Sequence, residues 1–477
     1  TLKLSEFVYA TGSFAFVQGP RIRPDVSLGL PNTISSLASD AITAVFPDEF
    51  IDFLSTYADP DNINILRDFE MSTMTMGASN VNVFVGLNGP YKEDTNGDHD
   101  LSDETPNEEA IGFVIDNLDF GLAMMTPTIS ESIGGIGQFL PKFYSAKATA
   151  DLAGFVGLDL LELSVEDVEL NINAGTPWPA GLGVPTVDFA GSFPAEAAGE
   201  DPDGDDTAGE PAGLEINTGN PDEPVYLDYD AQFRVGVSIG QANVSLLDFV
   251  HMQGSFAFEL GPRHNVTMST GIPGNLTGVL GGFGAEIDDF EVQTVTFGAS
   301  NVNAFVGFGE PDFDRPFDEQ DGLLGFVLDD LDLGMVLAKS TLAIIPQLEA
   351  FLPQFVAVKA SAETVGFKGF DFMEATAKDV TLNLNVGKPW PGGIGPPVIN
   401  WQKSFSAEAA GEDVDNDGRL GEPVGLEVGT GNPDAPVYID FDGNFRVGVE
   451  IGRFNANLFD AVQVMGSVAF ELGPTVT

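Results

Sequence analysis

The chain repeats itself over nearly its whole length, and an internal repeat limits the possible folds more than any single motif does. Three pairs of segments show it most clearly: GASNVN at Gly77 and Gly298, PWPAGLG at Pro177 with PWPGGIG at Pro389, and AEAAGED at Ala195 and Ala407. In the later part of each copy the offset is constant, because 389 − 177 = 212 and 407 − 195 = 212. The sequence therefore predicts two copies of one module. The first copy is longer, with insertions between Arg21 and Arg67 and around Asp94, as loops of a shared scaffold permit.

A third copy of one segment sets the phase of the repeat. GSFAF begins at Gly12, GSFAFELGP at Gly254 and GSVAFELGP at Gly466. We predict a junction strand over 1–11, one module over 12–253, a second over 254–465, and the first strand of a following repeat over 466–477. Such a strand suits a longer array or a subunit that completes its neighbour's sheet. The expected partners are neighbouring repeats or identical subunits, arranged end to end.

Apolar residues alternate with polar ones, which is typical of strands with one buried face. The alternating apolar positions include Phe445, Val447, Val449 and Ile451, then Val168, Leu170 and Ile172, and in the second copy Leu382, Leu384 and Val386. Turn residues such as TGNPD at Thr218 and Thr430 separate these segments. The expected fold is all-β, with two tandem elongated modules that are β-sandwich-like or β-layers. Short helices are expected at about 33–57, 128–141 and 340–352.

The charge balance excludes some partners. Asp and Glu number 73 against 19 Lys and Arg, for a net charge of −54, so phosphate backbones are repelled and nucleic acid is not an expected partner. Either some carboxylates bind divalent cations or they form a solvated surface suited to high salt. The chain has no Cys, so neither disulfides nor thiolate metal sites form. No apolar run approaches the roughly 18 residues of a spanning helix, so membrane insertion is not expected. Without a signal peptide at Thr1, the chain reads as a mature product or part of a longer one.

The strongest motif is an acidic loop, Asp413-x-Asp415-x-Asp417-Gly418-x-x-x-Glu422. Carboxylates at every second position can surround one cation, and calcium takes about six to eight oxygen ligands. The first copy has the same skeleton at the 212-residue offset: Asp201, Asp203, Asp205 and Glu210. The closing Glu comes at the tenth position, earlier than in an EF-hand. We predict calcium at both loops, with a solvated acidic turn as the alternative.

A second candidate loop is the insertion around Asp94 in the first copy. Its expected ligands are Asp94, Asn96, Asp98 and Asp100, and a shorter counterpart holds Asp312, Asp314, Asp318 and Asp321. The pairs Asp228 with Asp230 and Asp440 with Asp442 either complete a calcium shell or face solvent on a strand. Trp178 and Trp390, each between two prolines, either stack on sugars or pack on the core, and packing is favoured.

No catalytic constellation stands out. The sequence lacks a GxSxG elbow, a P-loop, HExxH and a Cys nucleophile. Acid pairs are so frequent that none identifies a glycosidase. We therefore expect no enzyme, and keep an acid hydrolase as a second alternative.

GSFAFELGP, GASNVNAFVG and the acidic DxDxDG loop resemble the giant repeat proteins of bacterial surfaces, which are calcium-dependent RTX-type adhesins with tandem β modules. The resemblance implies secretion to the extracellular space or cell surface, stiffening by calcium, and a role as fibre, filament or spacer. The leading expectation is thus a structural repeat segment of a surface fibre or adhesin. The first alternative is a glycan- or surface-binding module.

Overall fold

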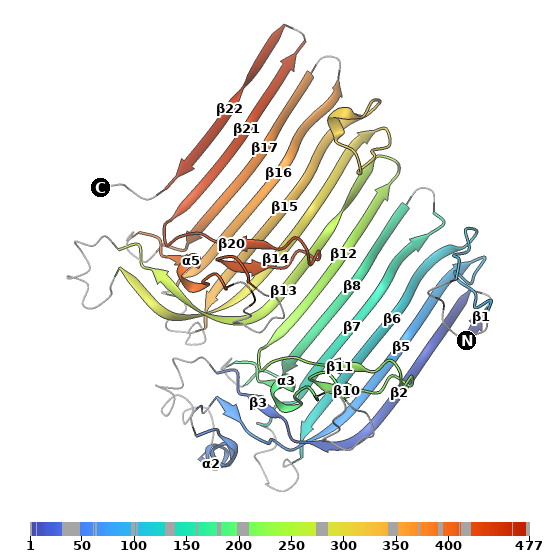
Figure 1. Cartoon of the computed structure of the whole chain (residues 1–477), viewed down its shortest axis with the longest axis vertical. Helices are drawn as coiled ribbons and strands as arrows, with labels where there is room; N and C mark the ends of the chain where they lie inside the picture. The colour runs from blue at the N-terminus through green and yellow to red at the C-terminus, as the bar shows by residue number, and fades with distance from the viewer. Residues whose placement is uncertain are drawn as a thin grey trace. The chain divides into compact units, whose positions relative to one another are not determined.

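Long antiparallel strands form most of the molecule (Figure 1). The computed structural model describes residues 2–5, 7–30, 48–60, 62, 64–96, 101, 104–128, 139–158, 161–178, 183–197, 209–272, 285–341, 352–370, 373–389, 395–409, 411, 421–459 and 461–473. The described residues divide into two compact units. Unit 1 takes them from 1–153 and 168–237, and unit 2 from 154–167, 238–343 and 350–477.

Seven strands of the large sheet run through the first repeat, and the first of them, β1, is the predicted junction strand. In spatial order they are β1 (Leu2–Ser5), β2 (Val8–Ile22), β5 (Met71–Leu87), β6 (Ile111–Pro127), β7 (Phe143–Val156), β8 (Leu161–Gly175) and β12 (Arg234–Leu246). The division into units cuts across β7, β8 and β12 and so differs from the limits of the sequence repeat. The alternation predicted from Val168 to Ile172 falls within β8.

Seven further strands follow: six belong to the second repeat, and β22 carries the third GSVAF segment, the predicted first strand of a following repeat. In spatial order they are β13 (Val250–Ser269), β14 (Glu286–Phe308), β15 (Leu324–Ser340), β16 (Gln354–Phe370), β17 (Met373–Gly387), β21 (Arg446–Leu458) and β22 (Val462–Leu472). Each pairs antiparallel with the next along the chain. The all-β prediction is confirmed, because the alternating segments form strands. The expected burial of one face is not found at Leu382 and Val449, which are among the exposed hydrophobic residues.

Short elements cover one end of each sheet. In unit 1 they are β3 (Asp25–Ser27), α2 (Asp48–Tyr57), β4 (Ile65–Leu66), β9 (Thr186–Asp188), α3 (Phe189–Ser192), β10 (Leu214–Ile216) and β11 (Val225–Leu227). In unit 2 they are β18 (Val398–Asn400), α5 (Trp401–Ser404), β19 (Leu426–Val428) and β20 (Val437–Ile439), with a 3-10 turn, η3 (Phe317–Glu319), elsewhere. The first predicted helix, at 33–57, is confirmed over its last residues, where α2 is found. Residues 33–47, 129–138 and 342–351 lie outside the described residues.

The core of unit 2 lies beneath these covering elements. Trp401 on α5 is fully buried beside Phe355, Val428 and Ile439. Its indole Nε1 donates to Asn385 Oδ1 at 3.2 Å, and the Asn385 amide donates in turn to backbone carbonyls. Every polar atom of this buried pair can thus be satisfied, as burial requires.

Unit 1 has an equivalent core around a different tryptophan. Trp178 is buried beside Phe50 of α2 and Phe189 of α3, and its Nε1 donates to the Leu28 carbonyl at 2.7 Å. The predicted packing role of this residue is confirmed, while Trp390 lies outside the described residues.

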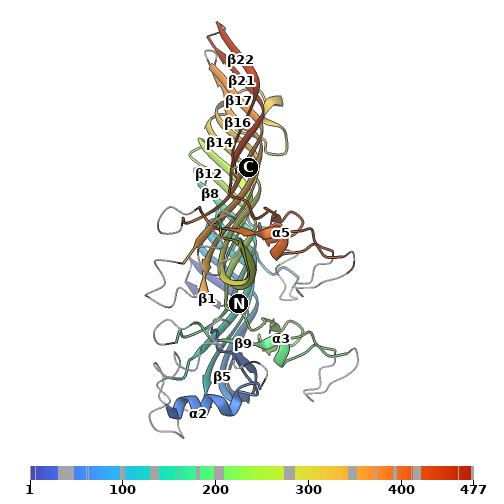
Figure 2. The same ribbon diagram turned by 90° about the vertical axis from the view of Figure 1, so that its left-hand side faces the viewer.

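Away from its covered end, the sheet of unit 2 is a single layer (Figure 2). The cross-strand partners Leu382 and Val449 are 38% and 39% exposed. The two predicted arrangements were a β-sandwich-like module and a β-layer. Most of the length of each strand lies in a single layer. Two-layer packing is found where the hairpin of β19 and β20 lies on β14, β15 and β16.

Paired glycines create the surface on which each hairpin rests. Gly298 lies opposite Gly334 on neighbouring strands, and a Cβ on Gly298 would stand 2.0 Å from the Gly429 carbonyl oxygen. Gly77 and Gly121 repeat this pair in unit 1. A Cβ on Gly77 would lie 2.3 Å from the carbonyl oxygen of Asn217. The repeated GASNVN segment is therefore explained by close backbone approach.

A row of residues with positive φ crosses the middle of the unit 2 sheet, with bulges between β14 and β15. Asn301, Asp330 and Asp379 have φ of 50°, 50° and 52°, in the left-handed region that Asn and Asp tolerate. The Asn301 backbone N–H donates to Asp332 Oδ1 at 3.1 Å. Unit 1 has the same bond, from Asn80 to Asp119 at 2.7 Å. The acids near these bulges thus fix the bend of the strands.

Replacing Asp332 with Asn should stabilise the protein at neutral pH. Burial raises the pKa of the Asp332 carboxyl above its ordinary value, so the folded state holds a proton more readily than the unfolded state. Asn keeps the acceptor for Asn301 and removes the partly buried charge. Stability curves in urea should show the gain at pH 7 and its loss as the pH falls through the folded pKa. An equal gain at pH 7 and pH 3.5 would contradict burial as the cause.

Candidate cation-binding loops

The two strongest acidic loops have identical closures. The Glu196 N–H donates to the Glu210 carbonyl at 2.8 Å, and the Glu408 N–H donates to the Glu422 carbonyl at 2.9 Å. These pairs are related by the 212-residue offset of the repeat. The two ends of each loop are therefore joined by a backbone hydrogen bond.

A tyrosine holds the closing glutamate of each loop. Tyr226 on β11 donates its hydroxyl to Glu210 Oε1 at 2.7 Å. Tyr438 on β20 lies 2.9 Å from Glu422 Oε1 and 2.7 Å from Glu427 Oε2. A phenol carries one hydrogen, so two carboxylates compete for it. Burial, followed by these carboxylates, raises the pKa of Tyr438 and keeps it protonated.

The remaining predicted ligands of these loops lie outside the described residues: Asp201, Asp203, Asp205, Asp413, Asp415 and Asp417. Across the described parts of the chain, no three His, Cys, Asp or Glu side chains are grouped to hold a metal ion. The structure therefore positions Glu210 and Glu422 at the loop bases, and calcium there stays a prediction. The two carboxylates beside Tyr438, Glu422 and Glu427, share a single hydroxyl hydrogen. Their negative charge would therefore stabilise a cation bound nearby.

The insertion loop around Asp94 is held by contacts within the loop and to β6. Thr95 donates from its backbone N–H and its hydroxyl to Glu104, at 2.7 and 2.8 Å. Lys92 forms a largely buried ion pair with Asp116 of β6 at 2.5 Å. Of the four predicted ligands here, Asp94 and Asn96 are described, whereas Asp98 and Asp100 lie outside.

The counterpart loop in unit 2 is closed by an amide and an ammonium. Gln320 accepts from the Asp312 N–H at 2.8 Å and donates to the Asp312 and Arg315 carbonyls at 2.7 Å. Lys368 Nζ donates to the carbonyls of Phe317 and Gln320. These backbone oxygens thus accept hydrogen bonds from a lysine ammonium group. Val156 stands at the equivalent place in the first repeat.

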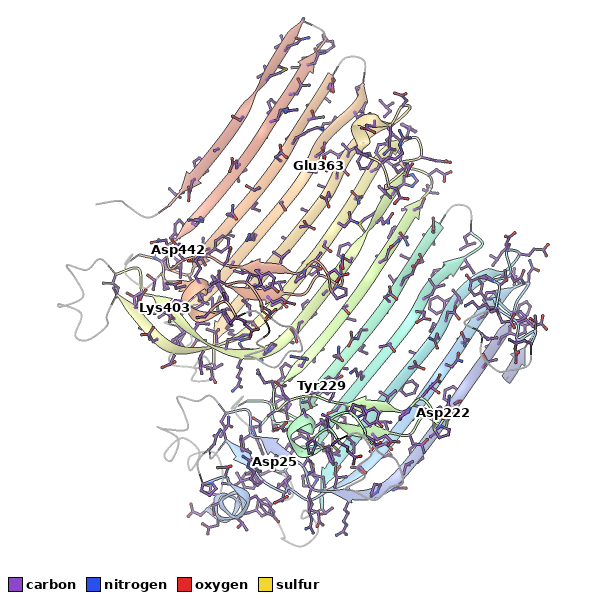
Figure 3. All side chains as sticks on the ribbon, in the orientation of Figure 1. Asp25, Asp222, Tyr229, Glu363, Lys403 and Asp442 are labelled. Carbon is purple, nitrogen blue, oxygen red and sulfur yellow. The ribbon has the colours of Figure 1, made fainter. Side chains whose placement is uncertain are left out.

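Asp228 and Asp440 pair with lysines, and they follow the ends of β11 and β20 rather than lying on a strand as expected. Lys147 Nζ lies 3.1 Å from both oxygens of Asp228, and Lys359 Nζ lies 3.0 Å from Asp440 Oδ1. Neither lysine is predicted as a partner of the acids from local sequence. The available signal was that Lys147 and Lys359, like Tyr226 and Tyr438, recur at the 212-residue offset. In Figure 3, Asp442 and Lys403 lie near the covered end of unit 2, and Glu363 lies in its open layer.

No family model matches this chain, and no curated protein or solved structure matches it. Among the described helices, none is both long and apolar enough to cross a bilayer.

Proposed function

We propose that the chain is a structural repeat segment of an extracellular surface fibre or adhesin, and that calcium in its acidic loops stiffens it. The observation that carries the proposal is the repeated closure by a backbone bond and a Tyr–Glu pair at Glu210 and Glu422. The ends of each loop are fixed, and the sequence between them carries three acids two residues apart, the residue type and spacing that a hard cation such as calcium prefers.

Long antiparallel strands support a mechanical role. Within unit 2, β13 through β17 pair along most of their length, so the backbone hydrogen bonds resist separation together. The chain has a net charge of −54, so repulsion between carboxylates opposes close packing of modules in series. Bound calcium would reduce this repulsion. Neighbouring modules or identical subunits are the proposed partners.

Calcium should raise the melting temperature of the whole chain and EGTA should lower it again. A site that binds only the folded state adds about 2.7 kcal/mol at a calcium concentration 100-fold above its Kd. The measurement is thermal unfolding by circular dichroism, with calcium or EGTA, at low and at high sodium chloride. A response to sodium chloride without any response to EGTA would favour a solvated high-salt surface instead.

Two matched variants separate site binding from general charge screening. The first carries Asp413→Asn, Asp415→Asn and Asp417→Asn in one loop. The second neutralises three exposed acids outside the loops by Asp222→Asn, Asp434→Asn and Glu450→Gln. The first should lose part of the calcium response and the second should keep all of it. Equal losses would show that calcium acts only as a screening ion.

A further inference from the structure

One face of the unit 2 sheet is apolar across neighbouring strands from β13 to β22. Residues that pair directly across antiparallel strands lie on the same face of a sheet. Three successive cross-strand rows on this face contain only apolar side chains, and together they define the back face of unit 2. The rows are Leu260, Val295, Leu337, Val356 and Val386; Phe258, Phe297, Met335, Val358, Leu384, Val447 and Leu472; and Phe256, Ala299, Leu333, Ala360, Leu382, Val449 and Phe470.

The back face points away from the elements that cover the other face. Successive residues of a strand point to opposite faces. Val336 and Ala357 are buried in the core beneath α5 and the hairpin of β19 and β20, so Leu337 and Val356 beside them point the other way. In Figure 2, α5 lies to one side of this sheet. The apolar rows are therefore not the inner side of the unit 2 core.

The back face is large enough for a stable interface. Phe258 is 41% exposed and Leu337 is 40% exposed, so their side chains contact solvent in the single chain. Strands about 4.8 Å apart with residues about 3.4 Å apart give the three rows an area of roughly 600 Å². Two such faces would bury about 1,200 Å² in total, where the range of stable interfaces begins. A contiguous apolar surface of this size marks a contact site.

The first repeat carries apolar residues at corresponding positions. Phe14 and Phe16 of β2 correspond to Phe256 and Phe258, and both are exposed. Met76 of β5 corresponds to Phe297 and is also exposed. An apolar face opposite the covering elements is thus a property of the repeated module.

We propose that the back faces of two copies of this chain pack against each other as the two layers of a β-sandwich. A second copy supplies a face of the same width and apolar character, as a symmetric pair requires. The three rows hold no ionisable residue, although the chain has a net charge of −54, so its acids stay outside the contact. Gln293, Lys339 and Gln354 form a polar row at one margin, which is typical of an interface rim.

This contact is lateral and adds a second interface to the end-to-end contact between identical subunits. It does not depend on calcium, so the experiments below are carried out in EGTA. Its failure would leave the calcium-stiffened fibre untouched, and a fibre without calcium would leave the lateral pair untouched.

Sedimentation velocity of the full chain over a concentration series tests the pairing. A monomer–dimer equilibrium is expected, and the dimer fraction should rise with sodium chloride. Salt screens the repulsion between two polyanions, whereas it does not weaken an apolar contact. An association held by ion pairs would respond to salt in the opposite direction.

Matched variants locate the contact on the back face. Phe258→Thr combined with Leu337→Thr keeps residues that favour strands and removes apolar area. Each substitution acts twice in a symmetric pair, so the dimer Kd should rise at least about 100-fold. Met465→Thr is the control, because Met465 is 78% exposed and lies an odd number of residues from Phe470 on β22, on the opposite face. It should change the Kd by less than about twofold.

A labelling experiment keeps the test valid if the double variant does not fold. The chain has no Cys, so one engineered thiol reports on one position. Leu337→Cys lies on the back face, and Ser361→Cys lies at an exposed position beside Ala360 on the opposite face of β16. As the dimer fraction rises, maleimide should react more slowly with Leu337→Cys and at an unchanged rate with Ser361→Cys.

Several outcomes would overturn the proposal. One is a chain that stays monomeric at every concentration in high salt. Another is a dimer that the double variant leaves intact or that Met465→Thr weakens equally. Equal protection of the two thiols would place the contact elsewhere. Flotation of the monomeric chain with zwitterionic vesicles, abolished by the double variant, would assign the back face to lipid instead.

Discussion

Replacing Trp401 with alanine should lower the free energy of unfolding by about 3–5 kcal/mol, the range for a buried aromatic residue truncated to Ala. Trp401 is fully buried and packs against Phe405 with ring centroids 6.1 Å apart. Its loss opens a cavity beneath α5 and leaves Asn385 Oδ1 without the indole N–H that it accepts at 3.2 Å. Both effects act in the same direction.

Urea unfolding by circular dichroism measures this loss, and hydrogen exchange of β16 and β17 shows where it arises. Leu382→Ala is the matched control, since Leu382 is 38% exposed in the open layer of the same unit. Its effect should stay below about 1 kcal/mol. Equal effects of the two substitutions would mean that the covered end is not the stabilising core of unit 2.

Gly298→Ala should destabilise by at least about 1–3 kcal/mol, although alanine normally suits a strand better than glycine. The added Cβ would stand 2.0 Å from the Gly429 carbonyl oxygen, and a backbone atom cannot turn aside as a flexible side chain does. The hairpin of β19 and β20 must then lift from the sheet. Exchange of amides in β19 and β20 should accelerate together with the drop in stability.

Gly448→Ala provides the contrast within the same sheet. A Cβ added to Gly448 on β21 would meet no heavy atom closer than 3.9 Å, so alanine fits there. Its effect should be neutral, or stabilising by up to about 1 kcal/mol through a less flexible unfolded chain. Comparable destabilisation by the two alanines would refute close approach as the reason for the Gly298 and Gly334 pair.

Much of the sheet was predictable from sequence, because the period-two alternation that is typical of a strand lies in neighbouring residues. The alternation through Leu382 and Val449 falls within β17 and β21 as expected. The one-turn helix α5 was not predicted. Four residues carry no helical period, and the helix exists because Trp401 is buried and Asn400 accepts from the Lys403 N–H at 3.1 Å.

The candidate loops were recognisable because carboxylates two residues apart stand out in any fold. Their supports were not recognisable, since Tyr438 approaches Glu422 and Glu427 only when β19 and β20 pair. The same holds for Lys368, which reaches the Phe317 carbonyl from a strand about 50 residues away. Such contacts depend on which strands become neighbours.

The sequence by itself determined the two-copy repeat, the all-β class, the acidic character and the position of the acidic loops. These properties are local or periodic, so neighbouring residues are enough to specify them. Tertiary structure alone decided that the strands form an open layer beyond the hairpins, that glycine pairs support those hairpins, and that apolar residues of neighbouring strands join into the back face. Each of these depends on the distance between segments far apart in the chain, which no local pattern records.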